Sequence, residues 1–183
     1  MPSLTSLPRS RPLRIAGLVA VALVLAGCAP DPEPAPTPTP AFASEEEAFA
    51  AAEATYRAYT DALNNVDPAD PSTFEATYAF SSGDFQQADR KNFSRMHAQG
   101  QQILGDALVA RFVGETASPL LDRIVAIVCI DVSGVEVIDS AGASVVNPNR
   151  PDVYEARVVF ENSPHGFLID KAGRIEGTTC SGL

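Results

Sequence analysis

Residues that build metal and redox sites are scarce in this sequence. The 183 residues include no tryptophan, two histidines and three cysteines. Neither His97 nor His165 stands in a His-x-x-x-His or Cys-x-x-Cys context, so ligands for zinc do not occur at usable spacing. A Gly-x-Ser-x-Gly nucleophile elbow and a phosphate-binding glycine loop are also missing. We therefore expect no metal site, no cofactor and no catalytic residue set, and the sequence does not assign the chain to an enzyme class.

Basic residues are few, and three of them lie near the start of the chain. Lysine and arginine number 13 against 23 aspartates and glutamates, a formal net charge of −10. Without residues 1–27, which contain Arg9, Arg11 and Arg14 and no acidic residue, the net charge is −13. Such an acidic surface argues against nucleic acid as a partner and against electrostatic adhesion to anionic lipid.

The uninterrupted apolar run Ile15–Leu25 is short, with 11 residues. A membrane-spanning helix needs roughly 20. With the three arginines before it, the run fits the apolar region of a secretory signal. Because those arginines are not adjacent, we expect export of the unfolded chain rather than the twin-arginine route.

The four residues that follow, Leu25-Ala26-Gly27-Cys28, resemble the bacterial lipobox, in which small residues precede a cysteine that is lipidated before cleavage. The resemblance implies that residues 1–27 are removed and that Cys28 carries a diacylglycerol. Each buried methylene contributes about 0.8 kcal/mol, so two acyl chains hold where one is marginal. We expect a lipoprotein anchored to the cell membrane on its extracytoplasmic face; the alternative is a secreted protein in which Cys28 is an incidental thiol.

Proline occupies every second position from Pro30 to Pro40. Proline fixes φ and favours extended geometry in the residue before it, which excludes a helix. A polyproline-like spacer of this length reaches up to about 40 Å. We expect residues 28–43 to be the lipidated cysteine and a tether, followed by one domain over residues 44–183.

The first half of that domain has the patterns of helices. Ser44 and Glu47 form a capping box, and an apolar stripe at helical spacing follows to the Asn64-Asn65 pair. Asp70-Pro71 suits the start of a second, short helix. A third is expected over 84–98, ended by Gly100. The stripe on the first helix consists of Phe49, Ala52, Tyr56, Tyr59 and Leu63.

The second half alternates with the period of strands. We expect strands at 108–113, 123–132 and 154–161, the middle one covered on both faces because it is apolar throughout except for Asp131. Segments 135–138 and 144–146 suit a hairpin. Segments 167–169 and 174–175 form the last strand or a hairpin around Ala172-Gly173.

Helices followed by antiparallel strands give an α+β fold class. This order over about residues 44–180 resembles the nuclear transport factor two-like superfamily, whose members form a cone from a curved antiparallel sheet closed by N-terminal helices. The run Tyr56-Arg57-Ala58-Tyr59, segment 89–97 and the pair Cys129 and Cys180 are also similar to a group of actinobacterial lipoproteins. That likeness implies no activity.

Cys129 and Cys180 remain once Cys28 is lipidated. Outside the cytoplasm two cysteines in one domain usually pair, so we expect a disulfide that holds the C-terminal tail on the central strand. The alternative is two free thiols, with Cys129 buried and inert.

Cone-shaped relatives include isomerases and dehydratases with an aspartate base and tyrosine donors. The resemblance makes Asp131 the candidate base, because it is the one acid in the apolar strand, and gives the candidate pocket residues Tyr56, Tyr78, Phe93 and Asp131. The favoured alternative is that Asp131 marks the solvated end of that strand, just before Ser133-Gly134.

Three functions remain open at this point. The first is a non-catalytic, membrane-anchored domain that binds a small molecule or an envelope protein of unknown identity. The second is a small isomerase, dehydratase or hydrolase that uses Asp131 with tyrosine donors. The third is a subunit of an envelope assembly, for which an exposed apolar sheet face would be the sign.

Overall fold

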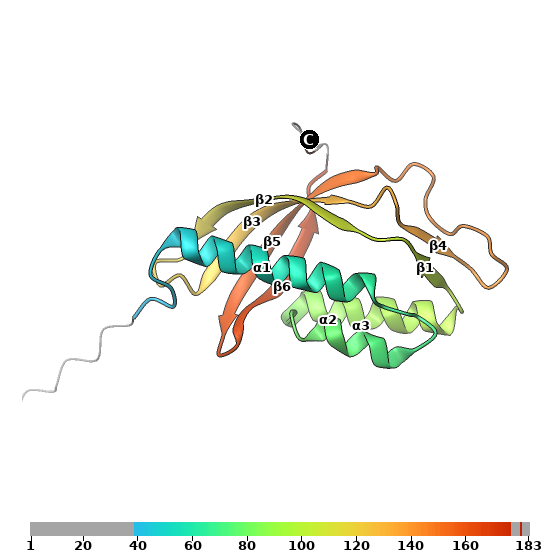
Figure 1. Ribbon diagram of the computed structural model, residues 1–183, viewed down its shortest axis with the longest axis horizontal. Helices are drawn as coiled ribbons and strands as arrows, with labels where there is room; N and C mark the ends of the chain where they lie inside the picture. Colours follow the sequence, from blue (N-terminus) through green and yellow to red (C-terminus); the bar gives the residue numbers. More distant parts are fainter. Residues whose placement is uncertain (1–38, 177–179, 181–183) are drawn as a thin grey trace, which may run out of the picture. The chain divides into compact units, whose positions relative to one another are not determined.

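Three helices pack against one face of a four-stranded antiparallel sheet (Figure 1). The computed structural model of the protein describes residues 39–176 and Cys180. The helices are α1 (Glu45–Asn64), α2 (Glu75–Tyr78), which follows a 3-10 turn over Pro71–Phe74, and α3 (Gly83–Ala98). The sheet has the order β2-β3-β5-β6, with bounds Leu108–Ala117, Arg123–Asp131, Val153–Ser163 and Gly166–Arg174. The predicted α+β fold class is confirmed.

Helix α1 begins where its capping residues place it. The Ser44 hydroxyl accepts a hydrogen bond from the Glu47 amide at 3.1 Å. The Glu47 carboxylate accepts in turn from the amide of Ala43, one residue before the cap, at 3.0 Å. Ala48 and Ala52 are fully buried in its N-terminal half, which brings the helix close to the sheet. The larger Tyr56 and Tyr59 follow in its C-terminal half.

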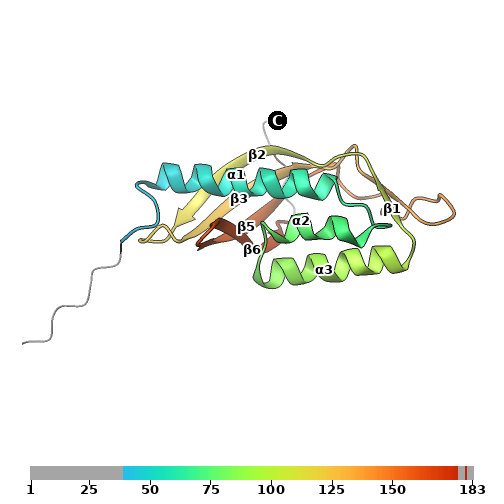
Figure 2. The same cartoon turned by 60° about the horizontal axis from the view of Figure 1, so that its bottom comes forward.

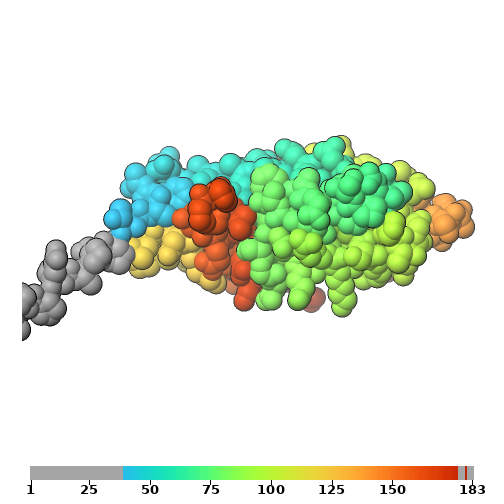
Figure 3. All heavy atoms as spheres, turned by 90° about the horizontal axis from the view of Figure 1, so that it is seen from below, coloured from blue at the N-terminus to red at the C-terminus, as the bar shows by residue number. Residues whose placement is uncertain are grey.

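Helices α2 and α3 lie beside each other below the C-terminal half of α1 (Figure 2). The Asp70 carboxylate caps the 3-10 turn by accepting from the Ser72 amide at 3.0 Å, as the Asp70-Pro71 pair predicts. A second small core holds these helices together; its buried members are Val66, Phe74, Phe93 and Met96. Seen from below, the helices and β6 form one continuous surface (Figure 3).

The central strand β3 is covered by helices on one face only. Ile124, Ala126, Val128 and Ile130 point to the helices and are at most 5% exposed. On the other face Val125 and Ile127 are half-buried. The prediction that this strand is covered on both faces is therefore wrong for most of its length. The physical reason is that long charged side chains on this face of the sheet, paired as Arg157–Glu115 between β5 and β2 and as Arg123–Glu161 between β3 and β5, shield it instead of a second layer.

Two strand predictions need correction. Segment 135–138 is strand β4 (Glu136–Ile138), but it pairs with β1 (Gln102–Leu104), a strand that the sequence analysis missed. Its contacts with the predicted partner 144–146 are one isolated bridge between Ile138 and Ser144, one backbone bond from Val145 to Val137, and a hydrogen bond from the Ser144 hydroxyl to the Glu136 carboxylate. The hairpin considered around Ala172-Gly173 does not form, because β6 continues through both residues, paired with Val158 and Arg157.

The predicted disulfide between Cys129 and Cys180 is present, with the two Cα atoms 5.8 Å apart. It holds Cys180 against the face of β3 that the helices leave uncovered. Within residues 39–176, no helix combines the length and the apolar character that a bilayer crossing requires.

Candidate ligand-binding cavity

A cavity of about 580 Å³ lies between the C-terminal half of α1, helix α3, the β1–β4 pair and the inner face of β3 and β5. Its volume falls in the range of small-molecule sites. Most of its wall is apolar, contributed by Leu63, Phe93, Met96, Ile103, Ile130, Val132, Val135 and Val137. The polar residues on the wall include two groups with titratable side chains; Thr60, Asn64 and Asn92 also line the cavity.

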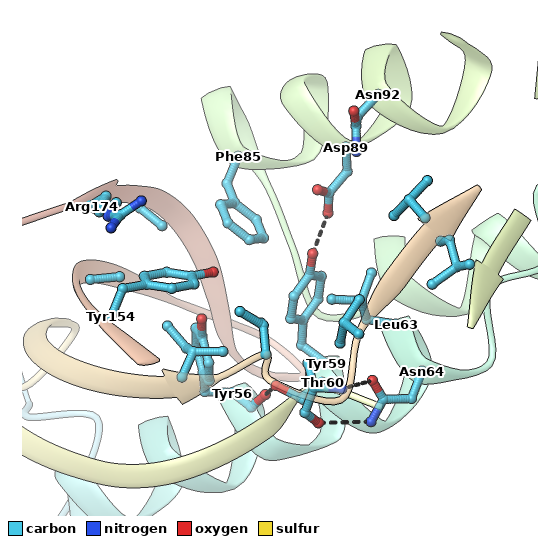
Figure 4. A pocket seen from close by; sticks show the side chains of 18 of the residues that line it. Tyr56, Tyr59, Thr60, Leu63, Asn64, Phe85, Asp89, Asn92, Tyr154 and Arg174 are labelled. Atoms are coloured by element: carbon cyan, nitrogen blue, oxygen red, sulfur yellow. Dashed lines mark hydrogen bonds between the residues drawn. The ribbon is translucent and has the colours of Figure 1, made fainter. Parts of the chain in front are cut away.

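The first polar group is a carboxylate bonded to a phenol. The Tyr59 hydroxyl, from α1, donates to Asp89 Oδ2, from α3, at 2.9 Å (Figure 4). Burial raises the pKa of Asp89 to about 6, although the bond from Tyr59 acts in the opposite direction. The pKa of Tyr59 is also well above its usual value, because the ring is buried and lies beside that carboxylate. Asp89 can therefore change its protonation state near neutral pH.

The second polar group joins two phenols to two arginines. Tyr56 and Tyr154 direct their hydroxyls into the cavity (Figure 4), and neither hydroxyl bonds to another residue of the described chain. Burial raises the pKa of both, so both stay protonated and available as donors. The Arg174 guanidinium lies over the Tyr154 ring, 5.2 Å from its centroid.

Arg150 reaches the cavity from the long segment between β4 and β5. Its Nη2 donates to the carbonyls of Val132 at 2.9 Å and Val135 at 2.8 Å, which fixes the guanidinium at the cavity wall. Arg150 and Arg174 also line an adjacent surface depression, together with Asn147, Asn149, Pro151 and Glu176. The two arginines therefore stand where the cavity meets the surface.

The structure brings together only two of the four predicted pocket residues. Tyr56 and Phe93 line the cavity. Tyr78 does not: its ring is covered by the Arg90 guanidinium, 3.8 Å from the ring centroid, and packs on the far side of Phe93.

Asp131 lies outside the cavity, so the interpretation that places it inside the cone is wrong. It sits on the outer face of β3, and its neighbour Ile130 takes the inward position. The carboxylate accepts from the Ser133 amide at 2.8 Å, a bond that lowers its pKa. These features agree with the alternative of a solvated strand end.

The acid in the cavity is Asp89, which the sequence analysis did not single out. A signal was present: Phe85, Asp89 and Phe93 are spaced by one helical turn each, so the acid interrupts an apolar stripe. Tyr154, Arg150 and Arg174 come from β5, a loop and β6, and no local pattern connects them.

The residues described by the structure offer one group with metal-ligand spacing, formed by Cys129, Glu155 and Cys180. Both sulfur atoms are joined in the disulfide, and the thiolate form that binds metals is therefore not available. The His97 ring lies at the end of α3, with Nδ1 2.7 Å from the carbonyl oxygen of Pro68.

Comparison with known proteins places the chain by its fold alone. No family model matches the sequence, and no curated protein matches it. Among 13 similar solved chains is the intermembrane space region of the chloroplast protein ARC6, with a TM-score of 0.51 and 13% identity, covering 69% of this chain and 95% of that one. Another, described as an aromatic ring hydroxylase from Novosphingobium aromaticivorans, has a TM-score of 0.52 and 13% identity and covers 72% and 90%.

At this level of identity the likeness shows a shared fold: helices packed on one antiparallel sheet. The class defined by fold and cavity together is an α+β domain with an internal pocket. Membership of the nuclear transport factor two-like superfamily is compatible with these neighbours and stays a prediction.

Proposed function

We propose that this protein is a small-molecule-binding lipoprotein of the cell envelope. Residues 1–27 would direct export, Cys28 and the residues to 43 would anchor and space the protein, and residues 44–183 would form a binding domain of the nuclear transport factor two-like type. The anchor rests on the sequence pattern around Cys28. The disulfide between Cys129 and Cys180 supports an oxidising compartment, because such bonds are rare in the cytosol.

The observation that carries the binding function is the cavity itself. A concave space of about 580 Å³ with a mainly apolar wall and a few placed polar groups has the form that small-molecule sites usually take. The unbonded hydroxyls of Tyr56 and Tyr154 can fix the orientation of a ligand by hydrogen bonds. A ligand supplies the contacts that the cavity lacks.

Titration with the neutral, apolar dye Nile red tests this function. We expect saturable binding at one site per chain, read as an increase in dye fluorescence. Ala172→Phe places a ring on the rim of the cavity, where Ala172 is exposed, and should weaken binding at least ten-fold. Ala54→Phe, on the solvent-facing side of α1 and away from the cavity, is the control. Equal binding by the two variants would refute a site in this cavity.

A second candidate is proton transfer, favoured by the raised pKa of Asp89 next to phenol donors. A carboxylate with a pKa of about 6 accepts a proton from carbon more readily than an exposed one, and the phenols can stabilise the oxyanion that forms. Asp89 thus takes the role that the sequence analysis gave to Asp131. Deuterium exchange into a cavity-bound ketone in D₂O, followed by NMR, should be lost in Asp89→Asn while binding is kept. Exchange that survives this substitution would exclude Asp89 as the base.

A further inference from the structure

Two arginines, Arg150 and Arg174, lie at the mouth of the cavity. The ion pairs among the described residues involve other basic side chains. They are Arg57–Glu53, Arg111–Glu155, Arg123–Glu161, Arg157–Glu115 and Lys171–Asp84. Arg150 and Arg174 form no ion pair with any residue of the described chain, although the protein has a net charge of −10. No described residue neutralises their charge by an ion pair.

The geometry keeps these charges together and in place. Arg150 is fixed by two backbone carbonyls through Nη2, which leaves Nη1 and Nε without a partner. Arg174 is held over the Tyr154 ring. Arg150 and Arg174 line both the cavity and the adjacent surface depression, and Tyr154 lines the same cavity. Tyr154, Arg150 and Arg174 form a cationic cluster with donors that converge on one end of the cavity.

The one carboxylate on the cavity wall lies away from this cluster. The pKa of Asp89 is set by burial and by the bond from Tyr59, without a contribution from either arginine. In Figure 4 the Phe85 ring lies between Arg174 and Asp89. Asp89 therefore does not neutralise the cluster. The rest of the wall is mainly apolar, with Leu63, Phe93, Met96, Ile103 and Val137, and suits a hydrocarbon chain; its uncharged polar members are Thr60, Asn64 and Asn92.

We propose that the cavity takes an amphipathic anion, with a carboxylate on Arg150, Arg174 and Tyr154 and a hydrocarbon chain among the apolar residues of α1, α3 and the β1–β4 pair. Guanidinium groups bind carboxylates through paired, charge-assisted hydrogen bonds, and partial burial strengthens them. This inference rests on the proposed binding function and names the chemical class of its ligand.

Displacement of Nile red from the full chain by dodecanoate and by dodecanol tests the inference. The two molecules have the same chain, and only dodecanoate carries a charge. For the unmodified protein we expect dodecanoate to bind at least ten-fold more tightly than dodecanol. Arg174→Gln and Arg150→Gln should each weaken dodecanoate about ten-fold and leave dodecanol unchanged. Arg157→Gln removes the same charge from the outer sheet face and should change neither.

The other outcomes distinguish failure of the anion site from failure of the binding function. Equal affinity for dodecanoate and dodecanol, or arginine variants that affect both molecules alike, would overturn the anion site and leave the binding function standing. An equal loss in Arg157→Gln would reduce the effect to net charge and overturn it as well. Failure of both molecules and of the dye itself to bind would remove the binding function together with this inference.

Discussion

Asp89 and Asp131 show how differently one residue type behaves in two places of this fold. Asp89 is buried against the Tyr59 ring, and its pKa rises from 3.8 to about 6. Asp131 is solvated and bonded to the Ser133 amide, and its pKa falls. The two carboxylates should therefore have opposite effects on the pH dependence of stability.

Asp89→Asn should stabilise the domain at neutral pH. The pKa of Asp89 is higher in the folded state than in the unfolded state, so the folded protein binds the proton more tightly between pH 3.8 and about 6. The contribution of Asp89 to the free energy of unfolding is fully present below pH 3.8, and it is lost as the pH rises through about 6. After allowance for partial exposure, the substitution should add about 1–2 kcal/mol at pH 7.5 and nothing near pH 3.5. Urea unfolding at both pH values measures the difference.

Asp131→Asn is the matched control, with the opposite sign. A carboxylate with a lowered pKa contributes to stability at pH values above its unfolded-state pKa. This contribution is lost as the pH falls through its folded-state pKa. This variant should be less stable than the unmodified protein at pH 7.5 and equal to it at low pH. If both variants shift stability in the same direction, the environment assigned to Asp89 is wrong.

The sequence analysis named Asp131 as a candidate acid of the cavity, and the acid that lines the cavity is Asp89. It considered Asp131 because an acid in an apolar strand is conspicuous, and it favoured the alternative that Asp131 marks the solvated end of that strand. The direction of a side chain at the end of a strand depends on register, which the pairing of Asp131 with Leu108 and Val153 settles only in three dimensions. The spacing of Asp89 from Phe85 and Phe93 could have identified it as a cavity residue from the sequence.

At the scale of the element, the close contact between α1 and β2 depends on one glycine. Gly114 is in β2, and Phe49 is in α1. A Cβ on Gly114 would overlap the ring of Phe49, which packs against that strand. Gly114→Ala should destabilise the domain by about 1–3 kcal/mol, because the ring or the helix must move. Thermal unfolding followed by circular dichroism measures the loss.

Gly173→Ala provides the comparison in another strand of the same sheet. A Cβ at this position meets no atom within 4 Å, and its φ does not require glycine. This substitution should be neutral or slightly stabilising. An equal loss in the two variants would show that the Phe49 contact is not the cause.

The disulfide links β3 to the C-terminal tail across a sequence separation of 51. In the chain-entropy model, closing a loop of this size contributes about 4 kcal/mol. The double variant Cys129→Ala/Cys180→Ala should lose about 2–4 kcal/mol in urea unfolding, and reduction of the unmodified protein should produce a similar loss. A reduced protein as stable as the oxidised one would contradict a stabilising role.

Elements with local signals were predicted well, and elements that depend on distant partners were not. Ser44, Asp70 and Gly100 mark the helix ends by short-range capping and turn chemistry, and the helices lie within a residue or two of the expected bounds. Strands β1 and β4 are three residues each and exist because they pair with each other across the chain. No periodicity is detectable over so few residues.

At the scale of the whole molecule, residues 41–42 and the cavity lie toward opposite ends of α1. The chain joins the domain near Ala41, whose amide bonds to the Leu120 carbonyl at 2.9 Å, and Phe42 stacks on Phe167. The cavity is lined by α1 from Tyr56 onward. At 1.5 Å per residue, the start of α1 and the middle of this lining are roughly 20 Å apart.

Cys28→Ser tests the anchor. Expressed in a bacterium supplied with an alkyne analogue of palmitate, the unmodified protein should carry the label and sediment with membranes. The variant should be unlabelled and remain in the soluble envelope fraction, since its anchor has no acyl chains. Nile red binding by the purified variant should be unchanged, because Cys28 is far along the chain from the cavity residues. An unlabelled protein without the substitution would exclude lipidation.

Photo-crosslinking locates the bound ligand most directly. The full chain in detergent would be irradiated with a neutral, diazirine-bearing hydrocarbon probe, and the modified residues identified by peptide mass spectrometry. We predict modification of α1 from Tyr56 onward, of α3 around Phe93 and of the β1–β4 pair, all suppressed by excess dodecanoate. Modification confined to the outer face of the sheet, around Val113 and Ile127, would contradict an internal binding site.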